Sequence, residues 1–133
     1  MSTMTTRLAT NADGPAIAAL VAPKDESLSF DRVEPYWLVA ELPERGIVGC
    51  VQTCPSRPVG HLEMLVVSDA LSPFERGQVS RRLFIDGCAI LYGHGATHVR
   101  GFLAFSSKSL KRVLKKRGAV VVESGNLMLR RIV

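Results

Sequence analysis

The middle of the chain places a strand, a helix and a second strand in succession, and this order restricts the fold more than any other feature. Val59–Val67 is predicted to be a strand, Gln78–Tyr92 a helix with one apolar side, and Thr97–Ala104 a further strand. A helix that links two strands of one sheet in this way makes the strands parallel, with a right-handed crossover. A parallel strand pair is therefore expected, and Asp69–Gly77 is expected to be the loop before the helix.

Further elements on both sides of this passage predict an α/β (α+β) fold. The expected order is β-α-β-β-β-α-β-α-β-β, which gives a mixed, mostly antiparallel sheet of about six to seven strands with helices on both faces. The first helix is expected to begin at an Asn11 cap, and Ser106 or Ser107 is expected to cap the last one. The other strands are expected over Thr5–Ala9, Tyr36–Leu42, Ile47–Thr53, Ala119–Glu123 and Asn126–Val133. The other helices are expected over Asn11–Ala22 and Ser107–Arg117.

The size and composition predict one globular domain, residues 1–133. The chain has 133 residues, of which 47% are apolar and 22% charged, so disorder, a collagen-like repeat and a coiled coil are excluded. No apolar run approaches the roughly 18 residues that cross a bilayer, and the first residues lack the apolar segment of a signal peptide. The expected location is the cytoplasm. Cys50 and Cys54 lie about 13 Å apart along a strand, too far for a disulfide, and all three cysteines are expected to be reduced.

The chain carries a basic excess. Seventeen Lys and Arg stand against twelve Asp and Glu, which gives a net charge of +5 and suggests an anionic partner. Five basic residues recur at helical spacing and form one stripe: Lys108, Lys111, Arg112, Lys115 and Lys116. The stripe is interpreted either as a solvated outer face of a helix or as a contact to a phosphate. We do not expect nucleic-acid binding, because aromatic side chains are not interleaved with these cations. His94 and His98 lack a third ligand nearby, so no metal site is expected.

Several strings, in this order, resemble the GCN5-related N-acetyltransferase (GNAT) family over nearly the whole chain. They are Thr6–Asp13, Leu38–Glu41 with Gly46–Gly49, Leu62–Val67, Phe74–Leu83 and Lys108–Gly118. The resemblance implies the GNAT fold and transfer of an acetyl group from acetyl-CoA to an amine. Nothing in the sequence identifies the acceptor amine.

The resemblance also implies where the coenzyme binds. In the family a loop of the form Arg/Gln-x-x-Gly-x-Gly/Ala precedes a helix, whose first backbone N–H groups point at the pyrophosphate. Read from Arg76, this chain has Val79 and Arg81 at the two small positions; a one-residue deletion puts Ser80 at a small position instead. The alternative is a solvated basic helix start. The coenzyme-binding residues implied are Leu65, Val66, Val67, Arg76, Gly77, Gln78, Val79, Ser80, Arg81 and Ser107.

Catalysis needs a base, because an ordinary Lys amine has a pKa near 10.4 and must lose a proton before it attacks a thioester. Strand alternation puts His61, Glu63, Leu65 and Val67 on one face of their strand. By resemblance this strand lines the active site, so Glu63 is the candidate base with His61 in support; the alternative is a polar strand start near the surface. Leu114 stands where the family often has its acid Tyr.

The sequence is compatible with two functions. One is an acetyl-CoA-dependent N-acyltransferase, with the two central strands splaying apart near Val67 so that the amide-rich pantetheine arm of the coenzyme pairs with exposed backbone. The other is a non-enzymatic binding or assembly module on the same fold, as a homo-oligomer or within a larger assembly. Small divergent members of the family also resemble proteins encoded in bacteriophage genomes, which makes the virion the alternative location.

Overall fold

A computed structural model of the chain describes residues 3–23, 36–102, 112, 115–116, 120–123 and 126–130. Within the last predicted helix, Arg112, Lys115 and Lys116 are helical and exposed. Ser107 and Leu114, together with most of that helix, lie outside the described residues, as does most of the polar segment before Tyr36.

The described strands form one sheet in the order β1-β2-β3-β4-β5-β7-β6. Its strands are β1 (Thr5–Leu8), β2 (Trp37–Leu42), β3 (Gly46–Cys54), β4 (Val59–Val67), β5 (His98–Phe102), β6 (Val120–Glu123) and β7 (Asn126–Arg130). β4 and β5 pair in parallel, and every other described pair is antiparallel. The parallel pair that the central strand-helix-strand order predicts is therefore confirmed.

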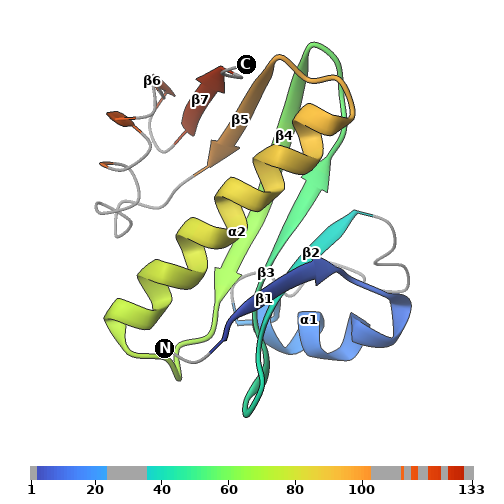
Figure 1. The fold of residues 1–133 in the computed structure, drawn as a ribbon, viewed down its shortest axis with the longest axis vertical. Helices are drawn as coiled ribbons and strands as arrows, with labels where there is room; N and C mark the ends of the chain where they lie inside the picture. Colours follow the sequence, from blue (N-terminus) through green and yellow to red (C-terminus); the bar gives the residue numbers. More distant parts are fainter. Residues whose placement is uncertain are drawn as a thin grey trace.

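Two helices pack on opposite faces of this sheet and create two cores. The helices are α1 (Gly14–Val21), which follows the short 3-10 helix η1 (Asn11–Asp13), and α2 (Pro73–Gly93). Figure 1 shows α2 lying across the sheet, and α1 contacts β3 and β4. Alternation along β2 serves both cores, because Leu38 packs with the α2-side cluster and Val39 with the α1-side cluster.

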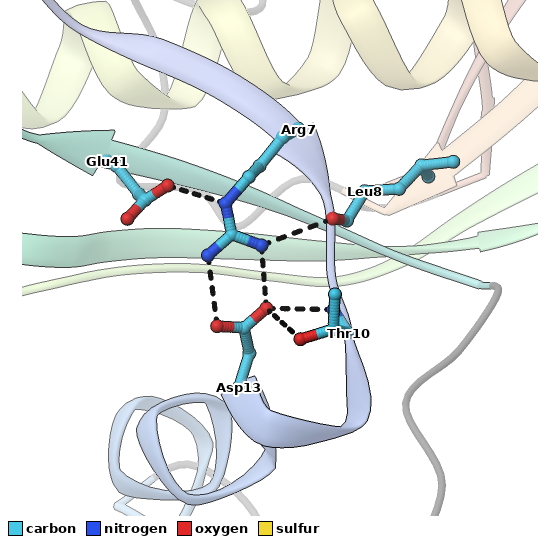
Figure 2. A network of polar contacts seen from close by, with 5 residues as sticks. All are labelled: Arg7, Leu8, Thr10, Asp13 and Glu41. Carbon is cyan, nitrogen blue, oxygen red and sulfur yellow. Dashed lines mark hydrogen bonds and ion pairs between the residues drawn. The ribbon is translucent and has the colours of Figure 1, made fainter.

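α1 is fastened to the sheet by a polar network around Arg7 of β1 (Figure 2). The Arg7 guanidinium donates from Nε to Glu41 Oε1 at 2.6 Å, and from Nη1 and Nη2 to the two Asp13 carboxylate oxygens at 2.7 and 3.0 Å. The Thr10 N–H donates to Asp13 Oδ2 at 2.8 Å. Thr10, not the expected Asn11, is therefore the cap residue of the helical segment, which begins at Asn11.

α2 begins at Pro73 rather than at the expected Gln78. Ser72 caps it: the Glu75 N–H donates to Ser72 Oγ at 3.2 Å, and the Ser72 N–H donates to Glu75 Oε1 at 3.1 Å. This reciprocal pair is a capping box, and Pro73 takes the first helical position, where its missing N–H costs nothing. The connection from β4 to α2 is therefore only Ser68–Ser72, and the remainder of the predicted loop is helix.

Candidate active site

The parallel pairing of β4 and β5 ends in the middle of β4. The register runs from Val59 opposite His98 to Leu62 opposite Gly101. Phe102 still pairs with Asn126 of β7, but it has no partner on β4. Figure 1 shows β4 continuing past the end of β5. Among the described residues, β4 from Glu63 to Val67 thus has a strand on the β3 side alone. The residues directly after Phe102 lie outside the described ones, so the separation near Val67 stays a prediction.

A β-bulge interrupts β4 at this same place. Cys50 pairs with Val66 and Gln52 with Glu63, so Met64 and Leu65 together oppose Val51. Met64 has a φ of 54°, in the left-handed region that non-glycine residues rarely adopt. Bulges of this kind redirect side chains and are frequent next to active sites.

The bulge reverses which side chains of β4 face α2. Before it, Leu62 packs against α2 next to Gly87. After it, Leu65 and Val67 pack with the α2-side cluster, whereas Met64 and Val66 join the α1-side cluster. The expectation that His61 and Glu63 share a face with Leu65 and Val67 is therefore wrong, because the extra residue shifts the alternation by one.

His61 and Glu63 remain together, on the face opposite α2. His61 is half-buried and Glu63 is exposed. Register places Cys54 opposite His61 on β3 and Arg100 opposite it on β5, while Gln52 lies opposite Glu63. Cys54, Arg100 and Gln52 cannot be identified as neighbours of His61 and Glu63 from the sequence, because only the strand register brings them together. We call these five residues the polar row. All three cysteines are free, and both burial and the charge of Glu63 raise the pKa of the Cys54 thiol, so Cys54 stays protonated.

The residues expected to form a pyrophosphate loop lie instead within the first turns of α2. This applies to Arg76, Gly77, Gln78, Val79, Ser80 and Arg81. Val79 is fully buried in the core, and Arg81 is exposed. The carboxamide oxygen Oε1 of Gln78 is buried without a hydrogen-bond partner among the described residues. A helix therefore stands where the family motif implies a loop, because Ser72 and Glu75 start it early.

The backbone N–H groups at the start of α2 are already used. Those of Ser72 and Glu75 serve the capping box, Pro73 has none, and the Arg76 N–H donates to the Ser72 carbonyl at 2.8 Å. This leaves Phe74 as the first-turn residue whose N–H has no partner among the described residues. The terminus that would attract a phosphate is thus occupied by the Glu75 carboxylate.

Two kinds of feature are absent from the described residues: a membrane-spanning helix and a metal-binding cluster. No helix in this part of the chain is long and apolar enough to cross a membrane. Residues 3–23, 36–102 and the shorter described stretches contain no group of three His, Cys, Asp or Glu side chains placed to hold a metal ion.

No protein-family model and no curated protein matches the sequence, whereas solved structures match closely in fold. Rv2747 from Mycobacterium tuberculosis, solved in complex with CoA and NLQ, superposes with a TM-score of 0.75 at 14% identity, over 96% of this chain and 99% of its own. Ard1 from Thermoplasma volcanium gives a TM-score of 0.73 at 16% identity, over 98% and 99% of the two chains. A GNAT-family N-acetyltransferase from Escherichia coli, in complex with CoA, gives 0.67 at 18% identity, over 96% and 81%. Similarity at these identities concerns the fold.

Proposed function

We propose that this chain, which has the GNAT fold, is an acetyl-CoA-dependent N-acyltransferase that moves an acetyl group to an amine, with Glu63 as general base. The observation that carries the proposal is the position of Glu63. Its exposed side chain stands at the residue where β4 loses β5 as a neighbour, beside the bulge and next to His61. The CoA complexes among the similar structures support the same donor.

The strand edge of β4 fits the amide-rich arm of acetyl-CoA. From Glu63 to Val67 the backbone is hydrogen-bonded to β3 on one side, and on the other side no described strand takes its N–H and C=O groups. An extended amide chain adds to such an edge as a further strand. Leu65, Val66 and Val67 would hold the arm there, and acetyl-CoA supplies a thioester carbonyl carbon that an amine can attack.

Glu63 would remove the proton that keeps the acceptor amine cationic. An exposed carboxylate on the open face of β4 can accept this proton directly or through one water molecule. His61, two residues earlier on the same face, would assist by holding the amine or the water. Solvent would protonate the leaving thiolate, since the usual Tyr position is Leu114, outside the described residues.

Replacement of Glu63 by Gln tests this role. A general base contributes about 10²–10⁴-fold, so Glu63→Gln should lower kcat by that factor and shift the pH profile upward, with coenzyme affinity little changed. The measurement is kcat against pH with a panel of amines, for wild type, Glu63→Gln and His61→Ala. Full turnover in Glu63→Gln with loss in His61→Ala would assign the base to His61, and full turnover in both would remove the base from this strand.

A second function is favoured by the start of α2. Ser72 and Glu75 use N–H groups of this helix start, which fits a chain that has kept the fold without the chemistry. Such a chain would be a binding or assembly module, including one in a virion. Thermal unfolding separates the two functions, since a ligand at about 100 times its Kd adds roughly 2.7 kcal/mol to stability. A shift with acetyl-CoA supports the enzyme, and its absence at millimolar acetyl-CoA supports the module.

A further inference from the structure

We infer that this chain recognises its acyl donor through the pantetheine arm and that the nucleotide phosphates add little, so that an acetyl thioester of pantetheine serves as well as acetyl-CoA. The inference rests on the proposed function and specifies the donor class for the same site. Its basis is that no described strand pairs with the edge of β4 from Glu63 to Val67, whereas a capping box already takes the N–H groups of Ser72 and Glu75 at the start of α2.

Most residues from Ser68 to Arg76 use their N–H groups within the chain, whereas those of Asp69 and Phe74 have no partner among the described residues. The Ser68 N–H donates to the Val48 carbonyl at 2.8 Å, the Ala70 N–H to Ser68 Oγ at 3.2 Å, and the Leu71 N–H to the Ser68 carbonyl at 3.3 Å. The capping box then takes the N–H groups of Ser72 and Glu75. A pyrophosphate is held by several converging N–H groups, and the described part of this segment leaves two, on Asp69 and Phe74, five positions apart in the sequence.

The side-chain charges near the start of α2 also balance. The Arg45 guanidinium lies 3.8 Å from Glu75, and the Arg76 guanidinium lies 3.6 Å from Asp69. Two cations therefore face two carboxylates, and Glu75 lies at the N-terminus itself, where it would repel an incoming phosphate.

The other arginines of α2 are too far along the helix to replace the missing N–H groups. Arg81 stands about 12 Å along the helix axis from Pro73. Arg82 donates from Nε to Asp86 Oδ2 at 2.6 Å, so its charge is directed to the middle of α2. Within the segment from β4 through α2, contacts for the donor are consequently concentrated on the β4 edge, which would meet the pantetheine amides and the thioester.

Isothermal titration of the full chain with acetyl-CoA and with acetylpantetheine tests the inference. The two dissociation constants should agree within about threefold and change little with salt, because charged contacts would be screened. Acetyl-CoA that binds more than about thirtyfold tighter, with affinity that falls as salt rises, would overturn the inference and leave the proposed function intact. If neither thioester binds, the proposed function fails together with the inference.

A charge-neutral variant tests the part assigned to Glu75. Glu75→Gln keeps an oxygen that can accept from the Ser72 N–H and removes the negative charge, so acetyl-CoA should gain affinity while acetylpantetheine does not. Glu44→Gln is the matched control, because it removes the same charge from the exposed turn beside Arg45 and should change neither affinity. An unchanged or lower affinity of Glu75→Gln for acetyl-CoA contradicts the role given to Glu75.

Discussion

Asp13 joins three parts of the molecule through one carboxylate. It accepts two hydrogen bonds from the Arg7 guanidinium of β1 and one from the Thr10 N–H, and Arg7 in turn contacts Glu41 of β2 (Figure 2). The hydrogen bonds from Arg7, with those from Thr10, lower the pKa of Asp13 from its ordinary 3.8 to about 2. Asp13 is therefore a structural carboxylate, and its side chain is only 13% exposed.

Replacement of Asp13 by Asn should weaken the fold in a pH-dependent way. The folded-state pKa lies below the unfolded-state value, so the ionised carboxylate stabilises the fold above about pH 4, and this contribution disappears as the pH falls toward 2. We expect Asp13→Asn to lower the free energy of unfolding by about 1 kcal/mol at neutral pH. The effect is modest because Arg7 is partly exposed and its charge is screened by solvent. Urea unfolding at neutral and acid pH should show wild type approaching the variant near pH 2. A constant difference at every pH would contradict this account.

At the scale of elements, two glycines report on the position of α2. A Cβ on Gly101 of β5 would lie 2.8 Å from Cε2 of the buried Phe84 ring, whereas a Cβ on Gly77 in the second turn of α2 meets nothing within 4 Å. Gly101→Ala should therefore destabilise the chain by about 1–3 kcal/mol through overpacking. Gly77→Ala should stabilise it by about 0.5–1 kcal/mol, because alanine favours helix. The measurement is the melting temperature of each variant compared with that of wild type. A lower melting temperature for Gly77→Ala would show that a loop, not a helix, occupies this segment.

The start of α2 also shows which sequence signals were strong and which were misread. Ser72 and Glu75 form an S-x-x-E capping box around Pro73, and this signal is visible in the sequence, but a proline is equally typical of a loop. The bulge at Met64 has no comparable signal, since the sequence has no glycine or asparagine at this left-handed position and only the register against Val51 reveals it. The face of Glu63 was predictable from alternation, and the faces of Leu65 and Val67 were not.

At the scale of the whole molecule, a single sheet is shared by two cores. The handedness of strand-helix-strand crossovers made the parallel β4–β5 pair predictable, because few alternatives satisfy that rule. The polar row across β3, β4 and β5 was not predictable, because it depends on three strands meeting in one register. The same strands contribute side chains to both cores, so a substitution that destabilises one core should also destabilise the other.

This shared sheet predicts that residues 1–133 unfold as one domain. Trp37, the single tryptophan, lies in the α1-side core and reports on that face, while far-ultraviolet circular dichroism is dominated by the long helix α2 on the other. Ile17→Ala in the α1-side core and Leu83→Ala in the α2-side core should each cost about 2–5 kcal/mol. In urea, fluorescence and circular dichroism should give coincident midpoints for wild type and for both variants, each shifted in both signals. If Leu83→Ala lowers the circular dichroism midpoint and leaves the Trp37 midpoint in place, the two faces unfold separately, and the chain is two cooperative units that share a sheet.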